Sequence, residues 1–188
     1  MSAPESKAQA LNNRVATLRT LVPAATMEAL LAALPPDTAE ILRNPPLAVT
    51  WLPSHHWARV VETAHKVVFA GDDAQVHRWG RTAMLSDLST VFRLFLKLAS
   101  PQFIARRASN LWDQYNRNHG RVHSREVDGS TVEAIYEGVG SANASFWLFQ
   151  RGVVHAAVEA SGVKDVEARI VSGGGASPSC TIRVSWRV

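Results

Sequence analysis

The clearest hydrophobic pattern of the chain lies in residues 180–188. Every even position from Cys180 to Val188 is apolar or carries sulfur, and every odd position is polar. A period of two is typical of a β-strand with one buried face. We therefore predict a final strand that lies far enough inside its sheet to bury Trp186.

Helical spacing dominates the chain before residue 120. Leu11, Val15, Leu18 and Val22 recur on one face of a first helix. Further helices are expected to begin at these signals: Pro23, Pro35-Pro36, Ser54 as N-cap, Gly71-Asp72, Ser86 or Asp87, and Ser100-Pro101. The last is predicted to be one long helix whose apolar face carries Ile104, Ala108, Leu111, Trp112 and Tyr115.

The pattern changes from helical to alternating at Gly120. Residues 121–127 and 130–137 flank Asp128-Gly129, a strong signal for a β-hairpin. An apolar helix is expected over residues 146–160, followed by a third strand over 166–170 and the final strand. The C-terminal half therefore reads strand, strand, helix, strand, strand. We predict an α+β fold in which a helical N-terminal part packs on a small, mostly antiparallel sheet.

Length and composition favour a single domain over residues 1–188. The chain is 46% hydrophobic and 19% charged, which suits a globular protein with a substantial core. We divide it into a loose tail (1–6), a helical part (7–119) and a sheet-containing part (120–188). The single cysteine excludes an internal disulfide and fits a cytoplasmic location. We expect neither a secretory signal nor a membrane span, since no window approaches the roughly 18 uninterrupted apolar residues that a span needs.

The hairpin offers a candidate anion site. If Asp128-Gly129 is a two-residue turn, Arg121 lies opposite Tyr136, and Arg121, His123 and Arg125 share one face. With that face inward, the three side chains would line a cavity suited to a carboxylate or phosphate. The alternative is a solvated edge strand on which charges discourage pairing with other chains.

Basic residues are concentrated between positions 91 and 125, where the only acid is Asp113. They are Arg93, Lys97, Arg106, Arg107, Arg117, Arg121 and Arg125. Nucleic acid could bind such a stripe electrostatically. However, Trp112 and Tyr115 lie on the apolar face, and no nucleic-acid-binding motif accompanies the charges. We therefore favour a solvated face or a surface for an acidic protein.

No metal site or catalytic motif is evident. Adjacent residues of a helix diverge by about 100°, so His55 and His56 are not expected to face one ion. Cys180 is predicted to be a buried structural thiol. The chain has no Gly-x-Ser-x-Gly, no phosphate-binding loop and no Gly-x-Gly-x-x-Gly. We therefore predict a protein without enzymatic activity, metal or cofactor.

Several strings resemble a paralogous family of myxobacterial proteins of unknown function. They are Asn44-Pro45-Pro46-Leu47 with Trp51-Leu52-Pro53, the segment 91–101, and Ala108-Ser109-Asn110-Leu111-Trp112. The closing Cys180-x-Ile182-x-Val184-x-Trp186 is also similar to the end of 4-vinyl-reductase-type small-molecule-binding domains. Those domains belong with haem–nitric-oxide sensors and transport-particle subunits to one broad superfamily.

The resemblance implies a non-enzymatic module with a pocket between helices and sheet, often within a dimer. It does not imply haem, because neither Tyr115 nor Tyr136 begins the Tyr-x-Ser-x-Arg string that haem sensors use for the propionates. The 4-vinyl-reductase-type domains also tend to carry further cysteines, which this chain lacks.

These observations lead to a sensor-like signalling module that binds a small apolar or anionic ligand or a protein, as a homodimer. Its expected pocket walls carry Trp112, Tyr115, Tyr136, Phe146, Phe149 and Trp186. Two alternatives remain: a scaffold without a pocket, and an Arg-dependent nucleic-acid-binding protein.

Overall fold

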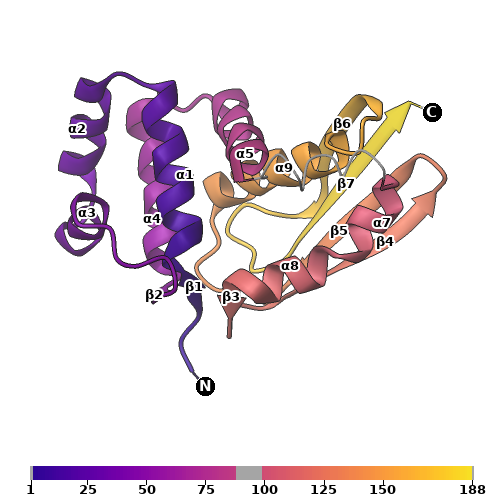
Figure 1. The fold of residues 1–188 in the computed structure, drawn as a ribbon, viewed down its shortest axis with the longest axis horizontal. Coiled ribbons are helices and arrows are strands. Elements are labelled where there is room, and N and C mark those ends of the chain that lie inside the picture. Colours follow the sequence, from indigo (N-terminus) through magenta and orange to yellow (C-terminus); the bar gives the residue numbers. More distant parts are fainter. Residues whose placement is uncertain (1, 88–98, 188) are drawn as a thin grey trace.

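The computed structural model describes residues 2–87 and 99–187. A group of N-terminal helices stands beside a four-stranded sheet, and further helices pack against one face of that sheet (Figure 1). This arrangement confirms the α+β prediction.

The N-terminal helices begin where prolines and capping residues predict. They are α1 (Ala8–Leu21), α2 (Ala24–Ala33), α3 (Pro36–Arg43), α4 (His55–Thr63) with a π-helical turn η1 (Ala64–Val68), and α5 (Asp73–Asp87). The Asp72 carboxylate accepts hydrogen bonds from the amides of Ala74 (2.8 Å) and Gln75 (3.3 Å), as expected of an N-cap.

Two predicted N-caps, Ser54 and the pair Ser86 and Asp87, already lie in helical backbone. Ser54 does not cap α4, because its backbone is already helical (φ −64°, ψ −20°) and its hydroxyl has no hydrogen-bond partner among the described residues. Helix α5 continues through Ser86 and Asp87. The helix that we expect to follow them, over residues 88–98, lies outside the described residues.

The single long helix predicted after Ser100 is wrong. The structure has two helices, α7 (Pro101–Arg106) and α8 (Ala108–Tyr115), separated at Arg107 (φ −91°, ψ −3°). No glycine or proline marks this break in the sequence. The predicted start is confirmed, since the Ser100 hydroxyl accepts a hydrogen bond from the Phe103 amide (3.2 Å).

The main sheet is antiparallel, with the order β4-β5-β7-β6. Its strands are β4 (Arg121–Asp128), β5 (Thr131–Glu137), β6 (Lys164–Gly173) and β7 (Cys180–Arg187), and α9 (Ala144–Glu159) connects the two pairs. The final strand β7 lies between β5 and β6, so its central position and the burial of Trp186 are confirmed.

The hairpin register predicted for β4 and β5 is wrong by one residue. Asp128 pairs with Thr131 and Glu126 with Val132, so Val127 forms a bulge. The Asp128 carboxylate accepts a hydrogen bond from the Ser130 amide (2.8 Å), which places Asp128 before the turn rather than at its centre. Because one extra residue reverses the faces, Arg121 and Arg125 lie opposite Glu137 and Glu133.

A second small sheet joins three distant parts of the chain. Its strands are β1 (Glu5–Lys7), β2 (Trp51–Pro53) and β3 (Asn116–Arg117), in the order β2-β1-β3. Residues 5 and 6 are therefore not a loose tail. So short a strand carries no recognisable alternation, and backbone pairing holds it instead.

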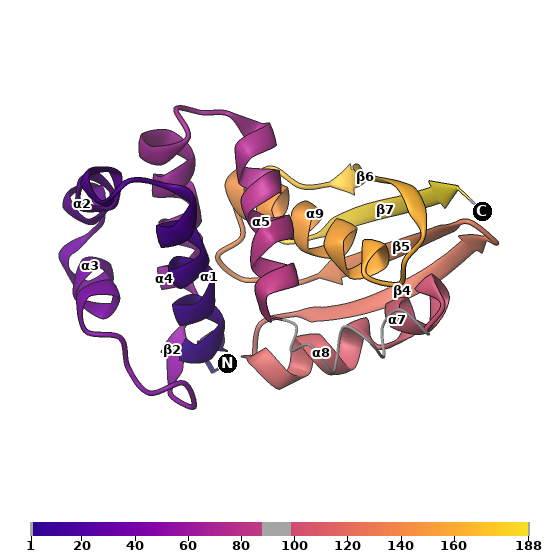
Figure 2. The same ribbon diagram turned by 45° about the horizontal axis from the view of Figure 1, so that its top comes forward.

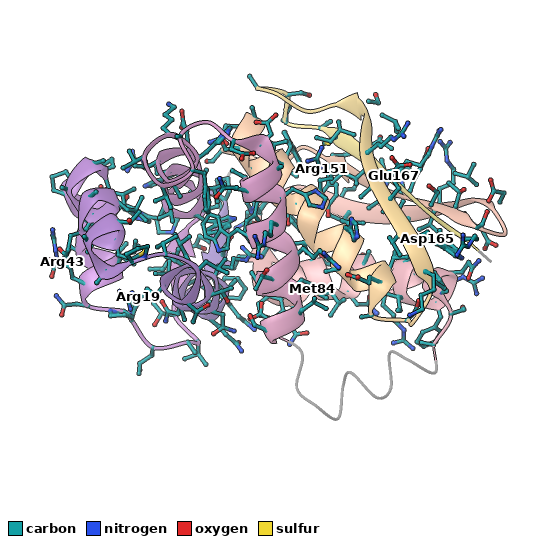
Figure 3. The ribbon with its side chains drawn as sticks, turned by 90° about the horizontal axis from the view of Figure 1, so that it is seen from above. Arg19, Arg43, Met84, Arg151, Asp165 and Glu167 are labelled. Carbon is teal, nitrogen blue, oxygen red and sulfur yellow. The ribbon has the colours of Figure 1, made fainter. Side chains whose placement is uncertain are left out.

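Helix α9 packs on β6 and β7 of the sheet, and α5 lies beside α9 on the side of the N-terminal helices (Figures 2 and 3). Trp79 of α5 meets Phe149 of α9 edge to face, with ring centroids 4.9 Å apart, and both side chains are completely buried. No helix in residues 2–87 or 99–187 is long and apolar enough to cross a lipid bilayer.

Candidate functional site

A cavity of about 450 Å³ lies between the helices and the inner face of the main sheet. Helices α1, α5, α7, α8 and α9 and strands β4 and β5 all contribute to its wall. This volume is within the range that small-molecule sites occupy. The cavity is the structural candidate for a binding site.

Apolar and aromatic side chains form most of the wall. Val122 on β4 and Val132, Ala134 and Tyr136 on β5 point inward, because alternate residues of a strand share a face. The Trp112 ring of α8 meets the Tyr136 ring edge to face, with centroids 5.6 Å apart. The inner face of the sheet and α8 therefore meet through aromatic packing at this side of the cavity.

The structure brings four of the predicted pocket residues together. Trp112, Tyr115, Tyr136 and Phe146 all line the cavity. The other two lie elsewhere: Phe149 is buried behind the wall against Trp57 and Trp79, with ring centroids 4.8 and 4.9 Å away, and Trp186 is buried near the end of β7.

The predicted basic cluster does not face the cavity. Arg121, His123 and Arg125 lie on the outer face of the sheet, because the bulge at Val127 reverses the expected register. Arg121 pairs with Glu137 (2.6 Å) and Arg125 with Glu133 (2.5 Å). Their position is therefore that of the alternative interpretation, in which the three side chains lie on a solvated edge strand.

Arg14 of α1 is the cationic wall residue that our sequence-based predictions did not include, and Asp87 of α5 and Glu133 of β5 are the acids of the wall. Its guanidinium carbon lies 4.7 Å from the Trp57 ring centroid and 5.4 Å from that of Phe149. Burial lowers the pKa of Arg14, although the neighbouring Asp87 opposes this shift. The sequence contains a pattern that could have predicted this position. Arg14 follows Leu11 by three residues and precedes Leu18 by four, so it lies on the same, buried face of the first helix.

Three polar atoms of wall residues also lack partners. Trp57 Nε1, Trp112 Nε1 and Gln150 Oε1 are buried and have no hydrogen-bond partner among the described residues. Buried polar atoms without partners are rare in folded proteins. Because these atoms are buried within the wall, they mark incomplete hydrogen bonding in the packing around the cavity.

His119 is the wall's histidine, and its ring is already engaged. Its Nε2 lies 2.6 Å from the Gly140 carbonyl oxygen, and its Nδ1 lies 3.2 Å from Asn116 Oδ1. Burial lowers the pKa of His119, which favours the neutral ring. The ring therefore fixes local structure and presents no free nitrogen to the cavity.

A separate group of side chains could hold a metal ion, contrary to our expectation. Ligand atoms of Asp37, His55 and His56 all lie within 4.8 Å of one another. His55 is the first residue of α4, and the two rings approach with centroids 4.2 Å apart. The Asp37 carboxylate is meanwhile paired with Arg59 at 3.0 Å. The argument that adjacent histidines must diverge is therefore wrong here.

A Ser–His–Asp contact also occurs, but it is poorly placed for catalysis. His65 Nδ1 lies 2.9 Å from Ser145 Oγ, and His65 Nε2 lies 3.2 Å from Asp73 Oδ1. Ser145 is only 5% exposed and does not line the cavity. A nucleophile must reach its substrate, so this contact explains local packing better than hydrolysis.

No protein-family model matches the sequence, and no curated protein is significantly similar to it. Solved structures of H-NOX proteins are similar in fold. The Fe(II) unliganded H-NOX protein from K. algicida has a TM-score of 0.71 at 8% identity, covering 97% of both chains. An oxygen-binding H-NOX domain related to soluble guanylate cyclases has a TM-score of 0.65 at 11% identity, covering 97% of this chain and 95% of the other. The chain therefore has an H-NOX-like fold, as its similarity to haem sensors implied.

The cavity does not fit a haem held through histidine. A similar structure concerns a haem redox potential modulated by porphyrin distortion, with a TM-score of 0.63 at 12% identity, covering 97% of this chain and 99% of the other. In this chain all seven histidines are among the described residues, and of these only His119 lines the cavity. Both nitrogens of its ring lie against oxygen atoms. Burial also raises the pKa of Tyr136, which disfavours a phenolate ligand.

Proposed function

We propose that this chain is a sensor-like module that binds a small, largely apolar organic molecule in its internal cavity and catalyses no reaction. The observation that carries the proposal is the cavity of about 450 Å³, walled by aromatic and aliphatic side chains.

The position of the cavity suits a sensor. Its wall is assembled from distant parts of the chain, including Arg14 on α1, Trp112 on α8 and Phe146 on α9. A ligand that touches all three elements would favour one arrangement of the helices relative to the sheet. In this proposal a second copy of the chain or a protein partner binds preferentially to that arrangement.

Native mass spectrometry of the protein as purified from cells tests the proposal. We expect extra mass that disappears on denaturation. The variant Ala157→Trp, whose new side chain enters the cavity from α9, should carry less of it. Ala74→Trp, on the exposed surface of α5, is the matched control and should behave like the parent.

Circular dichroism would verify that both variants are folded. A second filling variant, Val153→Phe, covers the case in which Ala157→Trp fails to fold. Equal bound mass in the parent and the filled variants would contradict the proposal. A Soret absorption band in the purified protein would instead show that the cavity accepts haem.

A further inference from the structure

The cavity of the proposed function contains a cation without a hydrogen-bonded anion. Arg14 has no hydrogen-bond partner for its guanidinium and no carboxylate within 4.0 Å among the described residues. A guanidinium offers five N–H donors, and the faces of Trp57 and Phe149 can accept none of them as a conventional hydrogen bond. The aromatic rings therefore accommodate the charge and leave its donors free.

Two acids, Asp87 and Glu133, also belong to the cavity wall. Asp87 is the acid with the largest electrostatic effect on Arg14, but it is hydrogen-bonded to the Asn13 side chain. Glu133 is held on the outer face of the sheet by Arg125 and Arg183, at 2.5 and 2.8 Å. Neither carboxylate neutralises Arg14 by direct contact.

The rest of the described wall carries no other formal positive charge. Burial favours the neutral ring of His119, and its nitrogens lie against the Gly140 and Asn116 oxygens. Asp87 attracts the Arg14 charge without a direct contact, so the buried guanidinium remains costly and a ligand anion hydrogen-bonded to it would lower that cost. The planar guanidinium fork matches a carboxylate with two parallel hydrogen bonds.

We propose that Arg14 binds the carboxylate of an amphipathic monocarboxylic acid, whose apolar body fills the space between α8, α9 and the sheet. The inference rests on the proposed function and names the ligand class for the same cavity. The head group lies at α1, and the apolar body contacts the wall that includes Trp112, Val132 and Phe146.

The test uses two probes that differ only in the head group, decanoate and 1-decanol. Their affinities for the full chain are measured at neutral pH by titration calorimetry, with tryptophan fluorescence as a second readout. We expect the parent protein to bind decanoate about tenfold more tightly than decanol, the contribution of one charge-assisted contact. Arg14→Gln should abolish this preference by weakening decanoate binding, whereas Arg14→Lys should retain part of it.

Arg19→Gln is the matched control, since Arg19 lies on the same helix away from the cavity (Figure 3). If Arg14→Gln does not fold, Arg14→Met provides the same test. Because either change removes a buried charge, we expect the unliganded variants to unfold at the same or a higher temperature than the parent.

The two proposals fail in different ways. Equal affinity of the parent for decanoate and decanol would overturn the role of Arg14 while leaving the cavity as a binding site. A decanoate preference that persists in Arg14→Gln would also overturn it. Absence of binding by both probes, together with a native mass equal to the denatured mass, would overturn the proposed function and this inference with it.

Discussion

His77 of α5 is a residue whose surroundings oppose its protonation. Arg151 on α9 donates a hydrogen bond from Nε to His77 Nδ1 (2.7 Å), and Figure 3 shows Arg151 beside the contact of the two helices. Burial, followed by the charges of Arg151, His155 and Arg81, lowers the pKa of His77 to about 4. The folded protein therefore holds this ring neutral.

We expect this histidine to make stability depend on pH. In the unfolded chain the His77 ring has a pKa of 6.5 and is protonated below that pH. In the folded chain the ring is protonated only when the pH nears 4. The contribution of the neutral His77 ring to the free energy of unfolding is thus fully present above pH 6.5, and it is lost as the pH falls toward 4. Urea unfolding should show a smaller acid-induced loss in His77→Gln than in the parent.

His123→Gln is the control for this prediction, because His123 is exposed on β4. His56, His119 and His155 also have lowered pKa values. The acid-induced loss of stability should therefore be smaller in His77→Gln than in the parent, but not zero. An identical pH dependence in His77→Gln and the parent would contradict the prediction, because it would show that the folded protein does not hold the His77 ring neutral.

Single residues also mark the limit of sequence reasoning at the candidate site. The aromatic wall residues Trp112 and Tyr136 could be predicted, because helical and strand periodicity place them on buried faces. The bulge at Val127 could not, since it depends on which backbone amide the Asp128 side chain captures. That single event decides whether Arg121 and Arg125 face the cavity or the solvent.

At the scale of elements, the contact of α5 and α9 depends on two glycines. A Cβ atom at Gly80 would lie 2.1 Å from the Phe149 backbone oxygen, and one at Gly152 would lie 2.1 Å from the His77 backbone oxygen. Each glycine thus allows the backbone of the opposite helix to approach closely. Backbone atoms cannot move aside as a flexible side chain can.

We expect Gly80→Ala to destabilise the protein by about 2–3 kcal/mol, because α5 and α9 must separate. Helix propensity alone would favour alanine by roughly 1 kcal/mol, so the sign of the measured change distinguishes the two effects. Gly129→Ala, where nothing lies within 4 Å of the added carbon, is the matched control. A stabilised Gly80→Ala variant in urea unfolding would contradict close packing at this position.

Regular elements could be predicted where periodicity or capping is strong. Helix α9 and strand β7 show this, with long apolar patterns that the structure reproduces. The break between α7 and α8 could not be predicted, because Arg107 is neither a helix breaker nor a cap. Both helices pack against β4, and such tertiary contacts are not encoded in the local sequence.

At the scale of the whole molecule, β1 joins the N-terminal helices to the sheet-containing part. It pairs with β2, just before α4, and with β3, just after α8. Ser6 donates a hydrogen bond to Asn116 Oδ1 (2.7 Å), and Glu5 pairs with Arg117 (2.6 Å). Because α1 follows β1 directly and carries Arg14, this pairing also fixes one wall of the cavity relative to α8.

Ser6→Pro should therefore affect both stability and binding, although Ser6 does not line the cavity. Proline removes the backbone N–H of the central strand and the hydroxyl that bonds Asn116, so we expect a loss of about 2–3 kcal/mol in urea unfolding. The affinity for decanoate should fall as well, because α1 and α8 lose their common anchor. Ser2→Pro, at an exposed position before the strand, is the control. Reduced stability with unchanged decanoate affinity would show that the cavity is held by the helices and the main sheet without help from β1.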